Sequence, residues 1–79
     1  MEDSPEESMI KNQTYAKVRD LIRQLPQEQK EVVILRHYAE LSFKEIAAIT
    51  NVSINTALGR MRYALINMRK LIQERHIAL

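Results

Sequence analysis

The chain has 79 residues and a mass of 9.3 kDa, which is enough for one small domain. Hydrophobic residues make up 46% of the sequence and charged residues 28%, a balance that is typical of a folded globular domain and excludes a disordered one. The absence of cysteine excludes disulfides and thiolate metal sites, and one glycine with two prolines is too few for the turns of an all-β fold.

Charge is distributed unevenly along the chain, whose formal net charge is +2. Residues 1–8 contain four acidic residues and no basic one, whereas residues 54–79 contain five basic residues and one acidic residue. A basic segment on a small domain is typical of a polyanion-binding surface, although many basic helix faces are only solvated. No apolar run approaches the roughly 18 residues of a membrane-spanning helix, so we expect a cytoplasmic protein without membrane contact.

The first predicted helix covers about residues 5–25. Ser4-Pro5-Glu6-Glu7 forms a capping-box start, and apolar residues then recur at spacings of three and four. A start at Ser8 is equally compatible, and it leaves residues 1–8 as an acidic linker or a frayed helix start. Pro26 ends this helix, because the residue before a proline is disfavoured in the helical conformation.

Two shorter helices are predicted over about residues 27–39 and 43–50. Pro26 suits the first turn of the former. The buried side of that helix is expected to contain Val32, Val33, Leu35, Tyr38 and Ala39. Ser42, followed three residues later by Glu45, forms a second capping box, which starts the latter helix.

Ser53 is the predicted N-cap of a fourth helix, which covers about residues 54–75. The segment from Ser42 to Ser53 has room for two turns of helix and a tight turn. A short helix, a tight turn and a longer helix form a helix-turn-helix unit, whose second helix enters the major groove of DNA with its N-terminal residues leading. We therefore predict an all-α fold, a small bundle of about four helices that contains a helix-turn-helix and no wing.

Three segments of the chain match the motifs of one known family. Residues 25–36, LPQEQKEVVILR, resemble an LP-x-x-x-R-E-V-x-x-L-R opening. Residues 40–47, ELSFKEIA, resemble G-L-S-Y-x-E-I-A, and residues 52–61, VSINTALGRM, resemble V-S-x-x-T-V-x-S-R-L. These motifs, in this order and spacing, are those of sigma factor region 4. The similarity extends from about Leu25 to Leu71 and is greatest to the extracytoplasmic-function subgroup of bacterial sigma factors.

The resemblance implies that residues 9–79 form a region 4-like helix-turn-helix domain that binds the −35 promoter element and docks on the β flap of the RNA polymerase core. An anti-sigma factor is a further candidate partner. A complete factor also contains a region 2, which melts the −10 element, and nothing in this chain resembles it. We therefore favour a part of a longer factor, with residues 2–8 as the end of an inter-domain linker, over a standalone domain.

The helical period of about 100° per residue separates two faces of the fourth helix. The face expected to pack on the other helices consists of Ile54, Ala57, Met61, Ala64, Met68 and Leu71. The face expected to contact DNA consists of Asn55, Gly59, Arg62, Tyr63 and Lys70, with Thr56 and Arg60 at its flank. The family usually has Arg or Lys at the position of Leu58, Ser at Gly59 and Arg at Tyr63, so the base contacts are expected to differ from the family's.

Base contacts and phosphate contacts are expected from different residues. Asn binds adenine and Arg binds guanine in the major groove, while glycine lets the backbone approach closely. The base-contacting candidates are Asn55, Thr56, Gly59 and Arg60, and the phosphate-contacting candidates are Lys44, Ser53, Arg62, Tyr63 and Lys70. The alternatives are that Arg60 and Arg62 are solvated or paired with acidic residues, and that Tyr63 packs on the surface.

An apolar stripe runs along one edge of the fourth helix. Leu58, Leu65 and Ile72 are spaced seven residues apart, and Ile66 lies on the polar side. The interpretation we favour is that the first helix covers the stripe. The alternative is a partner surface, because contiguous exposed apolar patches usually mark interfaces.

No pattern typical of catalysis is present. The sequence lacks a Ser-His-Asp set and a glycine-rich phosphate loop, and His37 and His76 have no neighbouring ligand pattern. We expect no enzyme, metal, cofactor or small-molecule ligand. The alternatives to a sigma factor domain are the helix-turn-helix output domain of another regulator, which Leu25-Pro26 disfavours, and a protein-interaction module with weak DNA affinity.

Overall fold

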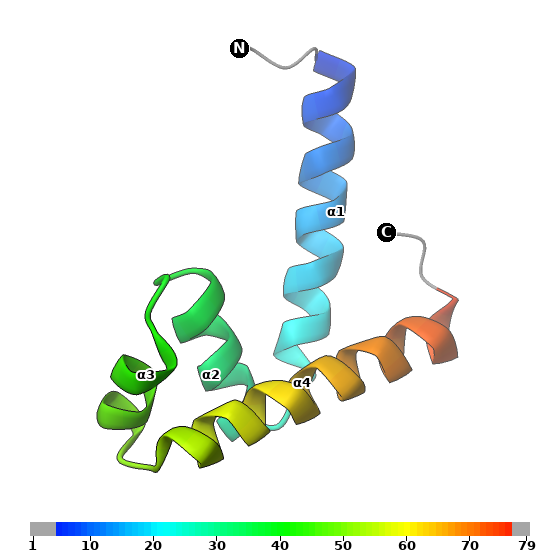
Figure 1. Ribbon diagram of the computed structural model, residues 1–79. Helices are drawn as coiled ribbons and strands as arrows, with labels where there is room; N and C mark the ends of the chain where they lie inside the picture. Colours follow the sequence, from blue (N-terminus) through cyan, green and yellow to red (C-terminus); the bar gives the residue numbers. More distant parts are fainter. Residues whose placement is uncertain (1–4, 77–79) are drawn as a thin grey trace.

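Four helices account for most of the described chain, and none of that part forms a strand. The structure, a computed structural model, describes the backbone of residues 5–76 and the side chains of residues 14–76. The helices are α1 (Pro5–Arg23), α2 (Gln27–His37), α3 (Phe43–Thr50) and α4 (Ile54–Arg75) (Figure 1). The predicted all-α fold is confirmed, and the predicted bounds of the third and fourth helices are those observed. The predicted cap at Ser4 lies outside the described residues.

The other three helices all pack against α4, with α1 rising from the middle of it (Figure 1). One buried cluster joins the end of α1 to α2 and α4 through Ile22, Leu25, Val33 and Ala64. A second joins α2, α3 and α4 through Val32, Ile46, Ala47 and Ala57. Met61 packs against both clusters, so a single side chain connects the two parts of the core. None of the described helices is long and apolar enough to cross a membrane.

The packed side of α4 has small residues where the helices meet. Ala57 and Ala64 are fully buried, and the other predicted members, Met61, Met68 and Leu71, are half-buried. The prediction that Ile54 belongs to this side is wrong, since its side chain is 45% exposed. Ile54 is the first residue of α4, and helical side chains tilt toward the N-terminus, so this one extends past the packed turns.

The connection from α1 to α2 is a tightened helix end. The N–H groups of Gln24 and Leu25 each donate to a carbonyl three residues back at 3.1 Å, and the Leu25 side chain is buried in the core. The first helix therefore ends at Arg23, two residues earlier than predicted. Pro26 has φ −52° and ψ 147° and occupies the N-cap position of α2 instead of its predicted place in the first turn.

The second helix also ends two residues earlier than predicted, because a left-handed residue terminates it. Glu40 has a φ of 56°, and the Leu41 N–H donates to the Leu35 carbonyl at 3.1 Å. This pattern closes a helix end and redirects the chain, here toward α3. Tyr38 and Ala39, which were expected on the buried side, are consequently exposed, whereas the prediction for the rest of that side is confirmed.

Candidate nucleic-acid interface

The capping box at the start of α3 positions the first helix of the helix-turn-helix. The Glu45 N–H donates to Ser42 Oγ at 3.1 Å, and the Ser42 N–H donates to Glu45 Oε1 at 3.2 Å. The Ser42 N–H, followed by its side chain, holds the pKa of the Glu45 carboxyl below its usual value. The capping box predicted from Ser42 and Glu45 is confirmed.

Three residues, Asn51 to Ser53, reverse the chain between α3 and α4. Asn51 is left-handed with a φ of 58°, a conformation that asparagine tolerates better than most residues. The Val52 N–H donates to the Ala47 carbonyl at 3.0 Å. This turn brings α3 onto α4, where Ile46 and Ala47 pack with Ala57.

Ser53 caps α4, and it engages Thr56 twice. Ser53 Oγ accepts a bond from the Thr56 N–H at 3.0 Å and donates to Thr56 Oγ1 at 2.9 Å. The Thr56 hydroxyl keeps its own proton to donate outward. Two hydrogen bonds therefore join these two predicted DNA-contacting residues at the positive end of the α4 dipole.

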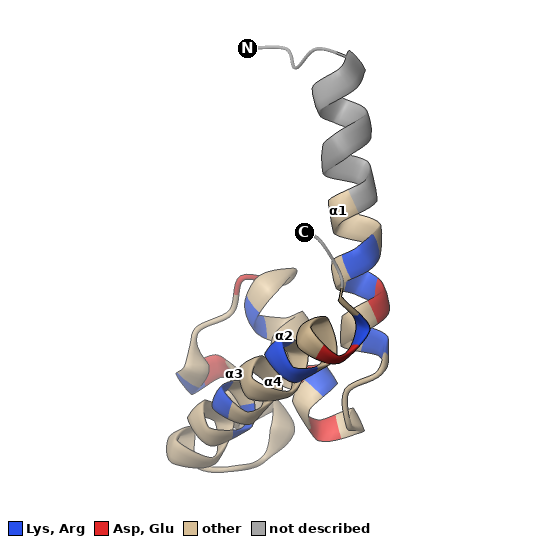
Figure 2. Ribbon diagram, turned by 90° about the vertical axis from the view of Figure 1, so that its right-hand side faces the viewer, with Lys and Arg blue, Asp and Glu red and all other residues tan. Residues whose placement is uncertain are grey.

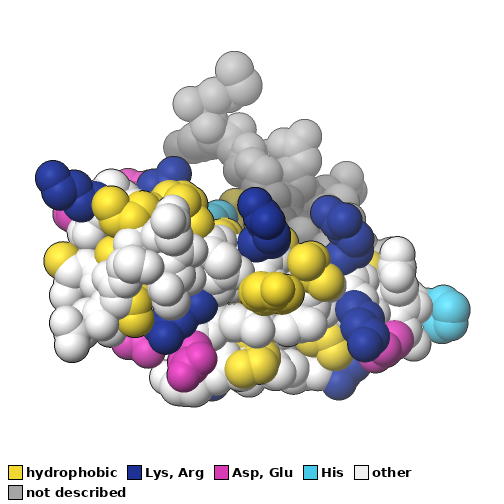
Figure 3. All heavy atoms as spheres, turned by 60° about the horizontal axis from the view of Figure 1, so that its bottom comes forward, with side chains coloured by type: hydrophobic (Ala, Val, Ile, Leu, Met, Phe, Trp, Pro, Cys, Tyr) yellow, Lys and Arg dark blue, Asp and Glu magenta, His cyan; other side chains and the backbone are white. Residues whose placement is uncertain are grey.

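The outer face of α4 is basic and open to solvent. Asn55, Arg62 and Lys70 are exposed, and Tyr63 is 61% exposed, so it does not brace the core. Along Ile54–Arg75 the sole acidic residue is Glu74, near the end of the helix (Figure 2). Figure 3, which brings the α4 side of the molecule forward, shows Lys and Arg side chains among hydrophobic ones. A face with both basic and hydrophobic side chains is suited to bind a polyanion that also has apolar groups on its surface.

Gly59 and Arg60 are both half-buried, Gly59 in the middle of the outer face and Arg60 at its flank. A Cβ built on Gly59 would meet nothing within 4 Å, and the residue has no positive φ. The fold therefore does not require glycine there, although glycine weakens a helix interior by up to about 1 kcal/mol relative to alanine.

Lys44 is exposed in the first turn of α3, on a segment that α2 holds in place. The Arg36 guanidinium lies 4.8 Å from the centre of the Phe43 ring and donates to the Leu41 carbonyl at 3.0 Å. Arg36 thus braces the loop before α3 and, through it, Lys44. Sequence reasoning missed this contact, because nothing in the spacing from Arg36 to Phe43 indicates that their side chains meet.

The apolar stripe of α4 is open, so the expectation that the first helix covers it is wrong. Leu58 is 43% and Leu65 50% exposed, and Ile66 is 49% exposed, whereas Ile72 is half-buried. The end of α1 packs instead near Ala64, on the opposite edge of the helix. A groove of about 450 Å³ runs beside the stripe and is lined by Phe43, Leu58, Met61, Arg62, Leu65, Ile66 and Arg69.

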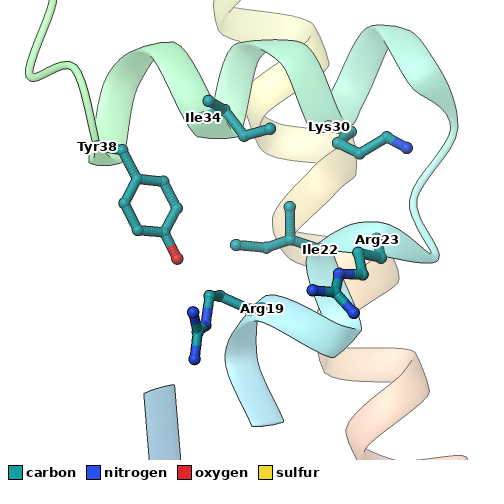
Figure 4. Close-up of a pocket in the computed structure, with 6 residues that line it drawn as sticks. All are labelled: Arg19, Ile22, Arg23, Lys30, Ile34 and Tyr38. Atoms are coloured by element: carbon teal, nitrogen blue, oxygen red, sulfur yellow. The ribbon is translucent and has the colours of Figure 1, made fainter. Parts of the chain in front are cut away.

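A second hollow, which the sequence did not indicate, lies between α1 and α2 (Figure 4). It measures about 230 Å³, and its wall combines three basic residues with apolar ones: Arg19, Ile22, Arg23, Lys30, Ile34 and Tyr38. Tyr38 extends from α2 toward Arg19 of α1 (Figure 4), while Ile22 is almost fully buried. Within the part of the chain that the structure describes, no three His, Cys, Asp or Glu residues are placed to hold a metal ion.

The chain matches known proteins over this same unit. Residues 15–65 match the family model described as Sigma-70, region 4. The chain is 30% identical over 59 residues to the RNA polymerase sigma-H factor of Pseudomonas aeruginosa, an alignment that covers 75% of this chain and 31% of that protein. It is 28% identical over 74 residues to the RNA polymerase sigma-E factor of Streptomyces avermitilis, covering 94% of this chain and 41% of that protein.

The matched residues 15–65 include all of α2 and α3 and the first half of α4, which together form the helix-turn-helix and its support. The chain therefore spans less than half of the length of these relatives. The match favours a sigma factor domain over the output domain of another class of regulator. The chain belongs to the sigma-70 region 4 family.

Proposed function

We propose that the chain binds the −35 element of promoters as the region 4 domain of a sigma factor, and so directs RNA polymerase to its start sites. The observation that carries this proposal is the exposed, acid-free N-terminal half of α4, presented by a capped turn within a helix-turn-helix. In such units the second helix enters the major groove with this end leading. A promoter-binding role carries with it a cytoplasmic location and requires no enzymatic activity.

Base contacts are assigned to four residues at the start of α4: Asn55, Thr56, Gly59 and Arg60. Asn55 is exposed and has the amide geometry that pairs with the N6 and N7 edge of adenine. Thr56 offers its remaining hydroxyl proton, and Gly59 admits the backbone to the groove. Arg60 is half-buried, so its guanidinium must extend from the flank of the helix to reach a base.

Phosphate contacts are assigned to five residues around this row: Lys44, Ser53, Arg62, Tyr63 and Lys70. Lys44 and Ser53 lie at the N-terminal ends of α3 and α4, where the helix dipoles favour anions. The other three are exposed along α4. Phosphate contacts set the register of the protein on DNA and contribute the salt dependence of binding.

The experiment is a binding titration against DNA duplexes selected from a random pool, repeated at several salt concentrations. Replacing Asn55 by Ala should weaken the preferred site by about 1–3 kcal/mol and relax the preference at one position. Replacing Lys44 or Arg62 by Ala should weaken all duplexes alike and reduce the salt slope by about one unit for each lost phosphate contact. Arg23→Ala, on α1 away from this face, is the matched control. Binding without any site preference would contradict the proposal.

A second role is favoured by the open groove beside α4. Leu65 and Ile66 are half exposed in a groove that Arg62 and Arg69 flank, which suits a protein segment with apolar and acidic side chains. The candidate occupants are the β flap of RNA polymerase and an anti-sigma factor. The partner surface consists of Leu65, Ile66 and Ile72 of the predicted set, whose fourth member, Leu58, lies among the DNA-contacting candidates. Leu65→Lys should leave a folded monomer and abolish binding to the isolated flap domain. Undiminished flap binding would contradict this role.

A further inference from the structure

We propose that Leu58 recognises the methyl group of a thymine in the bound promoter. One position of the preferred site then requires thymine because of an apolar contact with its methyl group. This inference rests on the proposed function, and it identifies a determinant of sequence preference that hydrogen-bonding residues do not supply. It uses three observations: the exposure of Leu58, its place in a row of polar residues, and the glycine beside it.

Leu58 lies in the second turn of α4 and is 43% exposed. Asn55 is three residues before it and Arg62 four residues after it, so the three side chains share one face of the helix. Both neighbours are exposed and polar. Leu58 is thus an aliphatic side chain between two DNA-contacting candidates; it also lines the groove beside the apolar stripe, it does not belong to the buried core, and it has no group that can bind phosphate.

The major groove offers one apolar group at a base edge, the C5-methyl of thymine, and aliphatic side chains contact it. Such a contact needs carbon atoms within about 4.5 Å, so the helix backbone must come close to the bases. Gly59 follows Leu58 directly, and a Cβ there would meet nothing in the protein. The missing side chain thus has no internal explanation, and it removes an obstacle to the close approach that a methyl contact requires.

Position along α4 separates Leu58 from the rest of the apolar stripe. Helix-turn-helix proteins contact bases through the N-terminal residues of the second helix, and Leu58 is the fifth residue of α4. Leu65 lines the same groove two turns later and is 50% exposed. Leu58 therefore belongs to the DNA contact, and Leu65 is a matched control with the same chemistry and similar exposure.

The test replaces each thymine of the selected site, one at a time, by deoxyuridine, which lacks only the methyl group. We expect one replacement to weaken binding of the unaltered chain about three- to fivefold, as for the loss of one buried methyl group. Leu58→Ala should bind the thymine duplex and the deoxyuridine duplex with equal affinity. That affinity should match the affinity of the unaltered chain for the deoxyuridine duplex. Leu65→Ala and Leu58→Met should retain the difference. Circular dichroism confirms that each variant is folded.

The outcomes separate this inference from the function on which it rests. If no deoxyuridine replacement weakens a well-defined preferred site, or if Leu58→Ala keeps the full difference, Leu58 does not recognise a methyl group and the promoter-binding proposal stands. If Leu58→Ala leaves DNA binding intact and abolishes binding to the flap domain, Leu58 belongs to the partner surface. If the chain shows no preferred site at all, both the proposed function and this inference are wrong.

Discussion

The turn between α3 and α4 and the connection between α1 and α2 join their helices in different ways. Ser53 caps α4 with a hydrogen bond from the Thr56 N–H at 3.0 Å, whereas Pro26, at the equivalent position of α2, makes no side-chain cap bond. The α1–α2 connection instead buries Leu25 between the helices. The α3–α4 turn thus adds side-chain hydrogen bonds between residues close in sequence to its packing, whereas the α1–α2 connection relies on backbone bonds and on the packing of Leu25.

The largest expected effect tests whether packing holds the α1–α2 connection. Leu25→Ala should lower the free energy of unfolding by about 2–5 kcal/mol, because it removes a buried side chain and leaves a cavity. Arg23→Ala, two residues earlier and exposed, should change it by less than about 0.5 kcal/mol. Urea titrations of both variants give the two values. A loss below about 1 kcal/mol for Leu25→Ala would show that packing there is not decisive.

The next effect tests the directional bond of the α3–α4 turn. Ser53→Ala should lower the free energy of unfolding by about 1 kcal/mol, because the Thr56 N–H loses its acceptor. Ser53→Asp restores an acceptor and should recover most of the loss. If the aspartate variant melts no higher than the alanine variant, the cap is not what stabilises this turn.

A substitution in the connection between α2 and α3 is expected to stabilise the protein. Glu40 has a φ of 56°, a conformation that is unfavourable for residues with a Cβ and natural for glycine. Glu40→Gly should raise the free energy of unfolding by up to about 1 kcal/mol, while Ala39→Gly, whose φ is not positive, should give no gain. Thermal melts of the two variants make the comparison. If Glu40→Gly lowers the melting temperature as much as Ala39→Gly does, the backbone at Glu40 is not strained.

The smallest effect is a pH dependence confined to the capped unit. Bonds from Ser42 lower the pKa of Glu45, so the ionised carboxylate stabilises the folded state at every pH above the ordinary glutamate pKa. This contribution is lost as the pH falls through the lower pKa of the folded state. The melting temperatures of the unaltered chain and of Glu45→Gln should therefore differ at neutral pH and converge in acid. A difference that is constant with pH would exclude this origin.

The sequence by itself determined the capped helix-turn-helix and its family. Ser42, Glu45 and Ser53 form hydrogen bonds with residues three positions away, so the local sequence is enough to predict these bonds. The bounds of α3 and α4 followed from them. The burial of Ala57 and Ala64 followed from the helical period. Base and phosphate assignments from the same period remain predictions.

Tertiary structure alone decided which surfaces stay open. The edge of α4 that α1 covers depends on how Ile22 and Leu25 meet Ala64, and these residues are about 40 positions apart in the chain, so no local pattern specifies their orientation. That packing leaves Leu58 and Leu65 exposed and creates the hollow between α1 and α2. Periodicity identifies the apolar side of a helix, but the angle between helices is set by side chains distant in sequence, and it determines which apolar residues remain available to DNA or to a partner.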